Sequence, residues 1–294
     1  MSMSQTRQPL FADADFADKV VFVTGAASGI GNGLARALAR RGARVAIADV
    51  RAEAIEQAAH DLRDTGAVVE PFAVDVADRE AMMACAASVA ERFGAVHLVI
   101  NNAGIAQVGT PLDQVDERTY RWMFDVNVHG VTNGMAAFTP YLRSNGTGGG
   151  HIVNVSSIAG LFLVPEWHIG LYSSTKMAVI PLSLGMRLAL APSNIGVSVV
   201  CPGRIWSELR SNSASLAPGG GALVSNLPDD IDEDVMSAAQ AAEIILHGVT
   251  NDRAFILTHP DHATDVAEYH KLIEDEFAYW KSALPDIPAA PKGG

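Results

Sequence analysis

A tyrosine and a lysine stand four residues apart in GLYSSTKMAV, residues 170–179, where no other side chain is charged. If this stretch is helical, Tyr172 and Lys176 lie one turn apart on the same face. A free phenol has a pKa of about 10 and is a poor base at neutral pH, but a nearby ammonium group favours the phenolate. The pair is therefore either an ordinary solvated pair or a device that lets a phenol exchange a proton near neutral pH.

A glycine-rich turn, TGAASGIG at residues 24–31, connects an expected strand to an expected helix. Its three glycines, Gly25, Gly29 and Gly31, allow a tight turn and a close approach of the backbone to a ligand. The free N–H groups and the positive dipole end of the helix then suit a pyrophosphate. The pattern predicts a dinucleotide site, although a plain strand-to-helix turn has the same composition.

The end of the next expected strand indicates which dinucleotide binds. Asp49 stands where a carboxylate accepts hydrogen bonds from a ribose diol and repels a 2′-phosphate. Ser28 occupies a position where a basic side chain would help to bind a 2′-phosphate. Both residues favour NAD over NADP. Arg51 is a counter-argument, because it can swing toward a 2′-phosphate.

Short apolar stretches alternate with helical ones, which predicts parallel strands covered by helices on both faces. Right-handed crossovers then give a doubly wound, Rossmann-type α/β sheet. We expect one domain over residues 1–294, with a motif core at about 16–260, a Ser-, Gly- and Pro-rich substrate lid at 204–235 and a C-terminal extension at 261–294. The expected strands are residues 20–23, 45–49, 68–75, 96–101, 151–155, 196–201 and 254–257, and the expected helices are 31–41, 52–64, 79–93, about 120–142, 172–190, 238–249 and an amphipathic stretch at 266–280.

The composition narrows the range of functions. With 33 acidic and 21 basic residues the net charge is −12, which repels nucleic-acid phosphates and anionic lipid. We see no apolar run long enough to span a membrane and no export signal, and therefore expect a cytoplasmic protein. Cys85 and Cys201 are expected to be buried, reduced thiols, and without a CxxC motif no metal site is expected.

These motifs occur in an order that resembles the short-chain dehydrogenase/reductase family over roughly residues 16–260. Stretches such as ADVRAEAIE and VNVHGVTNGM also look like the bacterial enzymes that oxidise benzylic alcohols of aryl ethers, the Cα-dehydrogenases. The motifs that carry the family resemblance are T-G-x-x-x-G-x-G at 24–31, D-V at 75–76, N-N-A-G at 101–104, V-N at 126–127, the serines at 156–157, Y-x-x-x-K at 172–176 and P-G at 202–203.

The resemblance implies a role for each of four residues. Tyr172 is the general acid/base, and Lys176 holds ribose hydroxyls and lowers the pKa of the tyrosine. Ser157, chosen over Ser156 because it begins S-I-A-G, binds the substrate oxygen, and Asn127 holds a water that links Lys176 to solvent. It also implies a homotetramer or homodimer built on the Tyr172 helix. The expected cofactor-binding residues are Gly25, Ser28, Gly29, Ile30, Gly31, Asp49, Asp75, Val76, Asn102, Ala103, Gly104, Tyr172, Lys176, Pro202, Gly203, Ile205 and Ser207, where Asp75 either contacts adenine or caps a helix.

The substrate pocket is expected to be formed by residues 158–170 and the lid. Its apolar side chains suit a bulky aromatic or alicyclic substrate, and His168 is either an extra base or a packing residue. We therefore expect an NAD-dependent oxidoreductase that interconverts a secondary alcohol and a ketone. The alternatives are a non-catalytic NAD-binding sensor, a steroid-type hydroxyl dehydrogenase and an NAD-assisted dehydratase or epimerase. The expected pocket residues are Ile158, Phe162, Trp167, His168 and Trp206.

Overall fold

The computed structural model describes residue 11 and residues 15–164, 167–218 and 235–284. The described chain falls into two compact units, one ending at His259 and the other beginning at Pro260. The expectation of one domain over the whole chain stays a prediction.

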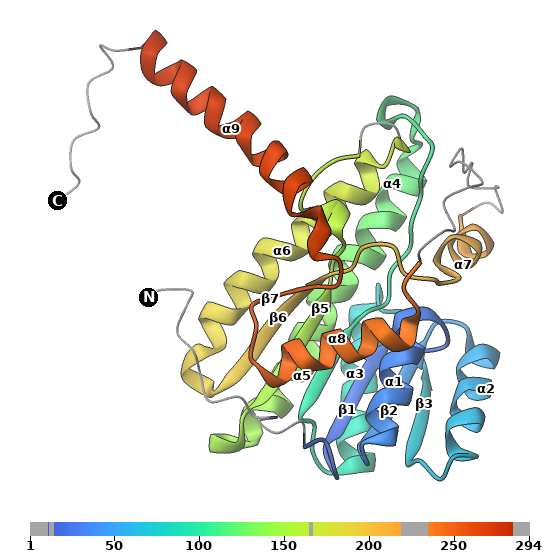
Figure 1. Cartoon of the computed structure of the whole chain (residues 1–294). Helices are drawn as coiled ribbons and strands as arrows, with labels where there is room; N and C mark the ends of the chain where they lie inside the picture. Colours follow the sequence, from blue (N-terminus) through green and yellow to red (C-terminus); the bar gives the residue numbers. More distant parts are fainter. Residues whose placement is uncertain (1–10, 12–14, 165–166, 219–234, 285–294) are drawn as a thin grey trace. The chain divides into compact units, whose positions relative to one another are not determined.

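A parallel sheet forms the centre of the first unit (Figure 1), and its described strands follow the order β3-β2-β1-β4-β5-β6-β7. The order reverses between β1 and β4, so the predicted doubly wound sheet is confirmed, and ligands of such sheets bind at this point. Every residue of β1, β5 and β6 is buried, as expected for strands covered on both faces. The strands are β1 Val20–Thr24, β2 Arg44–Asp49, β3 Val69–Ala73, β4 Leu98–Asn101, β5 Gly150–Val155, β6 Ile195–Cys201 and β7 Phe255–Leu257.

Helices cover both faces of the sheet and make a three-layer architecture (Figure 1). One face is covered by α1, α2 and α8, whose buried side chains share one hydrophobic cluster with the sheet. The other face is covered by α3, α5 and α6, and there the ring of Phe22 from β1 stacks on Phe138 from α5 with centroids 4.2 Å apart. The helices of this unit are α1 Gly29–Arg40, α2 Ala52–Arg63, α3 Arg79–Phe93, α4 Glu117–Phe124, α5 Gly130–Ser144, α6 Gly170–Leu190, α7 Leu209–Leu216 and α8 Ala238–Thr250.

Two expected elements differ from the observed ones. The expected helix at 120–142 consists of α4 and α5 joined by a π-helical turn, Asp125–His129, a local widening that is frequent at functional sites. The expected strand at 68–75 ends at Ala73, after which the N–H of Val74 still bonds to β2. Pro71 is tolerated because β3 is an edge strand.

The helix that carries the Tyr–Lys pair is longer than expected. It begins at Gly170, so Tyr172 lies in its first turn, and it continues through Pro181 to Leu190. Proline removes one backbone hydrogen bond from a helix interior but does not end this helix.

The second unit consists of a short turn, Pro260–His262, followed by α9, Ala263–Ala283. None of the side chains of α9 is buried, and its exposed apolar residues include Ile273, Phe277 and Trp280. Their spacing is that of an amphipathic helix, as the sequence predicts for residues 266–280.

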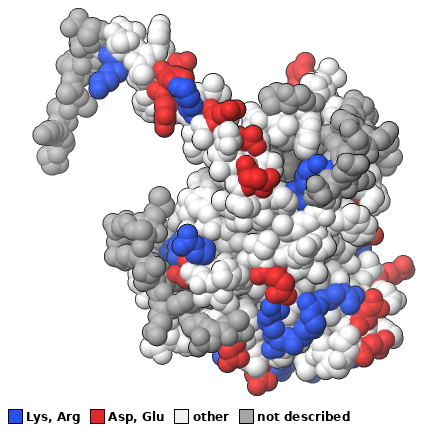
Figure 2. All heavy atoms as spheres, in the orientation of Figure 1, with Lys and Arg blue, Asp and Glu red and all other residues white. Residues whose placement is uncertain are grey.

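Charges on the surface are mixed in sign. On the face shown in Figure 2, basic side chains lie beside acidic ones. Arg40 and Arg41 at the end of α1, for example, form ion pairs with Glu243 of α8. Among the described helices, none is both apolar enough and long enough to span a bilayer.

Candidate active site

A cavity of about 350 Å³ lies at the carboxyl ends of the strands, on both sides of the point where the strand order reverses. Its volume is in the range of small-molecule and cofactor sites. The structure brings all the expected cofactor-binding residues to its wall except Gly31. Gly31 is buried, and a Cβ there would lie 2.3 Å from the carbonyl oxygen of Gly25, so this glycine is needed for packing of the turn.

The glycine-rich turn brings the first turn of α1 to the cavity. Gly25 and Gly29 have φ values of +64° and +54°, which other residues rarely adopt. Thr24, which the sequence reading overlooked, fixes the turn to the end of β4, because its hydroxyl accepts hydrogen bonds from the N–H groups of Asn102 and Ala103, each at 3.0 Å. Backbone N–H groups at a helix start favour a phosphate at this place.

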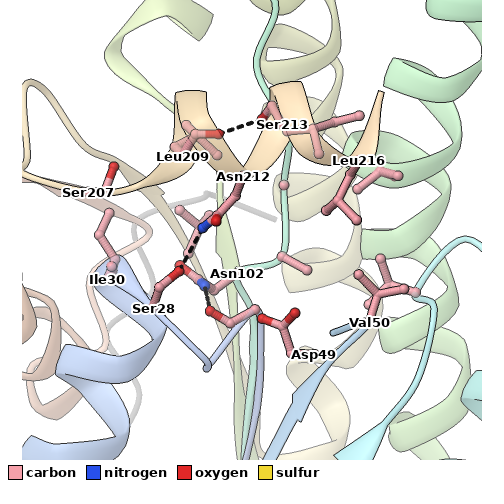
Figure 3. A pocket seen from close by; sticks show the side chains of 18 of the residues that line it. Ser28, Ile30, Asp49, Val50, Asn102, Ser207, Leu209, Asn212, Ser213 and Leu216 are labelled. Atoms are coloured by element: carbon pink, nitrogen blue, oxygen red, sulfur yellow. Dashed lines mark hydrogen bonds between the residues drawn. The ribbon is translucent and has the colours of Figure 1, made fainter. Parts of the chain in front are cut away.

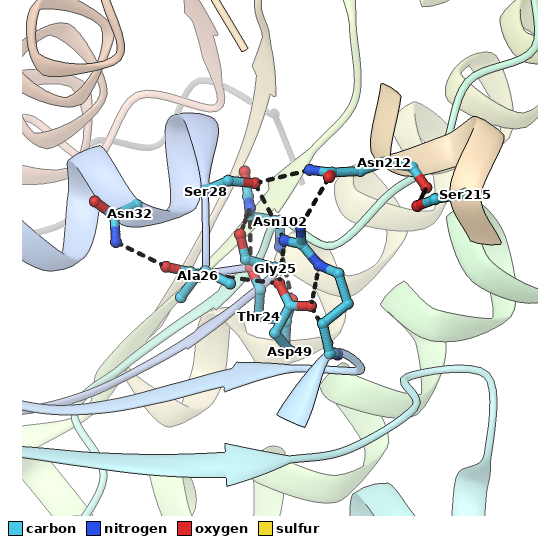
Figure 4. Close-up of polar contacts among 11 residues, drawn as sticks. Thr24, Gly25, Ala26, Ser28, Asn32, Asp49, Asn102, Asn212 and Ser215 are labelled. Carbon is cyan, nitrogen blue, oxygen red and sulfur yellow. Dashed lines mark hydrogen bonds and ion pairs between the residues drawn. The ribbon is translucent and has the colours of Figure 1, made fainter. Parts of the chain in front are cut away.

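One end of the cavity, which we call the Asp49 end, contains Ser28, Asp49, Arg51 and Asn212 (Figures 3 and 4). Asp49 ends β2, and its carboxylate forms an ion pair with Arg51, with Nε and Oδ1 3.0 Å apart. Arg51 also donates to Asn212 of α7, so it points along the cavity rim and not away from Asp49. Figure 3 shows Asn212 reaching from α7 toward Ser28.

Asp75 lines the cavity, but it is not a helix cap. Its Oδ1 accepts a hydrogen bond from the N–H of Ala77 at 2.9 Å, which closes a turn. The N-cap of α3 is Asp78, which accepts from Ala81 N–H at 3.0 Å. The helix-cap alternative for Asp75 is therefore wrong, and the contact with adenine stays a prediction.

The opposite end of the cavity, the Tyr172 end, contains Ser157, Tyr172 and Lys176. The Ser157 side chain lies beside the phenol of Tyr172, and its hydroxyl favours the phenolate. Ser157 itself begins a single turn, in which its Oγ accepts from Ala159 N–H. Ser156 has a different role, because its hydroxyl donates to the carbonyl oxygen of Lys176 at 2.6 Å. Of the two serines, it is thus Ser157 that meets the phenol.

Lys176 is almost fully buried, with 4% of its surface exposed. Its Nζ donates to the carbonyl oxygen of Val155 at 3.1 Å and lies 5.7 Å from the centre of the Tyr172 ring. A Cβ on Gly104 would lie only 3.1 Å from this nitrogen, so the N-N-A-G turn and the lysine are closely packed. Burial lowers the pKa of Lys176 to about 8, because low-dielectric surroundings disfavour an ammonium ion.

Burial also shifts the pKa of Tyr172, in the direction opposite to the one expected from the sequence. Desolvation raises it above the ordinary value, and the Ser157 side chain opposes this only in part. The Nζ of Lys176 lies 5.7 Å from the centre of the ring, and the groups that set the direction of this shift are burial and Ser157. The protein residues alone therefore do not produce the lowered tyrosine pKa.

Asn127 lies within the π-helical turn and is completely buried. Its side chain exchanges two hydrogen bonds with the backbone of Ile105, at 2.8 and 2.9 Å, and donates a third to Thr175 Oγ1 at 3.0 Å. Thr175 precedes Lys176 in α6. Asn127 thus ties the segment after β4 to the helix that carries the lysine, while its proposed water stays a prediction.

The structure does not bring the expected substrate-pocket residues to the cavity wall. Phe162 is buried elsewhere, Ile158 and Trp167 are partly buried, and His168 and Trp206 point to solvent, Trp206 with 67% of its surface exposed. The N–H of Trp206 bonds to the carbonyl of Met236, and this pairing turns its side chain outward. Contact of these five residues with a substrate stays a prediction.

Other residues form the apolar part of the wall. Most of them come from the segment after β4, from α4 and the π-helical turn, and from α7. Trp122 and Val126 stand one helical turn apart just before Asn127, a spacing that predicts a shared face and that could have been noticed. The positions on α7 fall within the expected lid at 204–235. Leu209 is one of the apolar residues that the sequence offers for the pocket, and it does line the wall. The wall residues that were missed are Val50, Val74, Ile105, Trp122, Val126, Val155, Asn212, Ser213 and Leu216.

The fold and the site together define a Rossmann-type oxidoreductase, with a cradle for a dinucleotide at one end of its cavity and a Tyr–Lys pair at the other. The chain belongs to the short chain dehydrogenase family, whose sequence model matches residues 19–216.

Comparisons with individual proteins agree with this assignment. The chain is 35% identical to the C alpha-dehydrogenase of Sphingobium sp. strain SYK-6 over 277 residues, 91% of this chain and 89% of the relative. It is 38% identical to the cis-4-hydroxycyclohexanecarboxylate dehydrogenase of Sinomonas cyclohexanicum, covering 64% of this chain and 74% of the relative. A short chain dehydrogenase/reductase of Burkholderia phymatum in complex with NAD superimposes with a TM-score of 0.79 at 29% identity, over 95% of this chain and 99% of the other. The expected similarity to the Cα-dehydrogenases is thus confirmed.

Proposed function

We propose that this protein is an NAD-dependent oxidoreductase that interconverts a secondary alcohol and a ketone. The observation that carries the proposal is that one cavity wall brings Ser157, Tyr172 and the buried Lys176 together with the glycine-rich turn and Asp49. Hydride transfer from an alcohol carbon also requires removal of the hydroxyl proton, and this end of the cavity holds a phenol suited to that task.

The residues at the wall fit a dinucleotide. A Cβ at Gly25 would lie 2.8 Å from the backbone of Ala103, so the cradle depends on its glycines. The glycine-rich turn would hold the pyrophosphate, Asp49 the adenosine ribose and Lys176 the nicotinamide ribose. A bound oxidised nicotinamide would supply the hydride acceptor and a positive charge. Such a charge would favour the phenolate of Tyr172, whose pKa is raised by burial in the protein alone.

The protein's own residues manage the proton. Ser157 Oγ holds the oxygen of the substrate, and Tyr172 Oη accepts the hydroxyl proton as the C–H electron pair leaves with the hydride. In the reverse direction Tyr172 returns the proton to the ketone oxygen. Lys176, with a pKa lowered to about 8, releases a proton more readily than an exposed lysine and connects the phenol to further proton exchange.

The wall beside Tyr172 supports a bulky apolar substrate, aromatic or alicyclic. Trp122 and Val126 pack with Tyr172 in one cluster, and Leu209 and Leu216 of α7 line the same cavity. An aromatic wall of this kind contributes large contact areas to ring-shaped ligands. The names of two relatives, a C alpha-dehydrogenase and a hydroxycyclohexanecarboxylate dehydrogenase, agree with an alcohol substrate.

A panel of secondary alcohols, aromatic and alicyclic, assayed separately with NAD and NADP tests the proposal. We expect formation of NADH with at least one ring-containing alcohol. In Tyr172→Phe, turnover should fall at least about a thousandfold while NAD binding, measured by calorimetry, is retained. Full activity of this variant would overturn the mechanism, whereas binding of NAD without turnover of any alcohol would favour a sensor.

We also propose that the protein acts in the cytoplasm as a homodimer or homotetramer built on α6. Leu182 and Leu188 are exposed apolar residues on α6, and the space next to Gly185 is open, which supports close packing of a second helix. The buried thiols Cys85 and Cys201 are both free, as suits a reducing compartment. Light scattering on Leu182→Glu and Leu188→Glu variants tests the assembly, and a monomer in the unchanged protein would contradict it.

A further inference from the structure

The carboxylate of Asp49 already uses its whole capacity for hydrogen bonds. Its Oδ1 accepts from the N–H and from the Nε of Arg51, both at 3.0 Å. Its Oδ2 accepts from the N–H of Ala27 at 3.3 Å and from Nη2 of Arg51 at 3.2 Å. A carboxylate offers about four acceptor positions. A ribose diol therefore binds Asp49 only if the guanidinium of Arg51 withdraws.

The guanidinium of Arg51 is held in this place from the other side of the cavity. Its Nη1 donates to Oδ1 of Asn212 at 2.8 Å, and its Nη2 donates to Oγ of Ser28 at 3.2 Å. The amide of Asn212 is itself oriented, because its Nδ2 donates to the same Ser28 oxygen at 3.1 Å (Figure 4). Side chains from β2, the glycine-rich turn and α7 thus form one closed network.

The ion pair between Arg51 and Asp49 should weaken the binding of NAD and strengthen the binding of NADP. For NAD, the diol must replace two charge-assisted hydrogen bonds of Arg51, so part of the favourable contact with Asp49 is lost. For NADP, the 2′-phosphate meets a carboxylate whose charge is already compensated by a cation at 3.0 Å, so the repulsion is reduced. An aspartate without an arginine partner would discriminate more strongly between NAD and NADP.

We propose that Arg51 competes with the adenosine ribose for Asp49 and so sets how strongly the protein prefers NAD over NADP, with Asn212 holding Arg51 in the competing position. The inference rests on the proposed function, because it presupposes that the ribose of a nicotinamide dinucleotide binds at Asp49.

The test compares dissociation constants of NAD and NADP, measured by calorimetry, for the unchanged protein and for Arg51→Ala. We expect the Kd of NAD to fall and that of NADP to rise, so that the ratio changes by about tenfold or more, since the Arg51 side chain makes two charge-assisted hydrogen bonds with Asp49. Asn212→Ala should shift the ratio in the same direction by a smaller factor. Arg51→Lys keeps the charge without the planar fork and should lie between.

The control is Arg143→Ala, which removes the same charge from the exposed end of α5 and should leave the ratio unchanged. A melting curve of each variant establishes that it is folded. A ratio that stays constant in Arg51→Ala, or moves toward NADP, would overturn the inference alone. Absence of binding of both dinucleotides to the unchanged protein would overturn the proposed cofactor as well, and this outcome is seen before any variant is made.

Discussion

The charged side chains at the two ends of the cavity have different partners. At the Asp49 end an acid and a base are paired directly, 3.0 Å apart, and both are bonded to neutral partners. At the Tyr172 end, Lys176 is buried with a backbone carbonyl as its partner, and none of the described carboxylates pairs with it. A buried cation without a charged partner has a displaced pKa, as Lys176 does. The first arrangement suits binding, and the second suits proton transfer.

The largest expected effect comes from removing the buried cation. Lys176→Met keeps a long apolar side chain in α6 but removes the charge beside the phenol, so kcat should fall by roughly a thousandfold. Steady-state kinetics with a ring-containing secondary alcohol measure this. The matched loss of a cation at the other end, Arg51→Ala, should act on dissociation constants of the cofactor instead. If both variants lost turnover to the same degree, the two ends would not have separate roles.

The pH dependence of stability distinguishes the two ends next. The pKa of Lys176 is lowered from 10.5 to about 8 in the folded protein. Between these values the unfolded chain binds more protons than the folded one, so the free energy of unfolding should rise with pH. The contribution from Lys176 between pH 8 and pH 10 is about 2 kcal/mol, since one pKa unit corresponds to about 1.4 kcal/mol.

Chemical denaturation at pH 8 and pH 10 measures this contribution as a difference between variants. Lys176→Met should lose the gain of about 2 kcal/mol. Lys271→Met on α9 is the control, because Lys271 is exposed and its ion pair with Asp275 raises its pKa out of this range. The free energy of unfolding could instead rise equally between pH 8 and pH 10 in the unchanged protein, Lys176→Met and Lys271→Met. In that case Lys176 would keep its charge in the folded protein up to the pH at which an exposed lysine loses it.

Substrate contacts at the Tyr172 end should show a smaller effect. Trp122→Ala removes an aromatic wall that packs with Tyr172, so KM for an aromatic alcohol should rise by about tenfold, as for the loss of about 1.4 kcal/mol of contact. Trp206→Ala is the control, because that side chain is exposed outside the cavity. The expectation from the sequence was the reverse, with Trp206 in the pocket. If KM rose in Trp206→Ala and not in Trp122→Ala, the prediction from the sequence that Trp206 contacts the substrate would be supported.

The features that could be predicted from the sequence are those that depend on residues close together in the chain. The glycine-rich turn, Asp49 and the Tyr172–Lys176 spacing depend on local backbone geometry and on the ends of neighbouring strands, and these residues do line one cavity. The opposite shift of the Tyr172 pKa depends on burial by the whole fold, which no short motif encodes.

The residues that were missed depend on contacts between distant segments. Asn212 lies 161 residues after Arg51 in the chain, and only the packing of α7 against the glycine-rich turn brings them together. Asn127 itself was predicted as a site residue, but the π-helical turn that contains it was missed, because that turn has no distinct composition. Side chains on loops and lids are placed by tertiary contacts, so their roles need the structure.

The smallest effect is expected from Ser28→Ala at the Asp49 end. This hydroxyl accepts hydrogen bonds from Arg51 and Asn212 at 3.2 and 3.1 Å, but it is partly exposed, so water can replace it. The bond from Asn212 is neutral and the bond from Arg51 is charge-assisted, but water can take the place of the hydroxyl in both, so the Kd of NAD should change by at most about tenfold, with kcat nearly constant. The same substitution at the other end, Ser157→Ala, removes the partner of the catalytic phenol and should lower kcat without a comparable change in NAD binding.

Two identical serine-to-alanine changes thus compare the ends directly, by calorimetry and kinetics on the same preparations. A fall in kcat for Ser28→Ala as large as that for Ser157→Ala would mean that the network at Asp49 positions the reacting groups and does not serve binding alone.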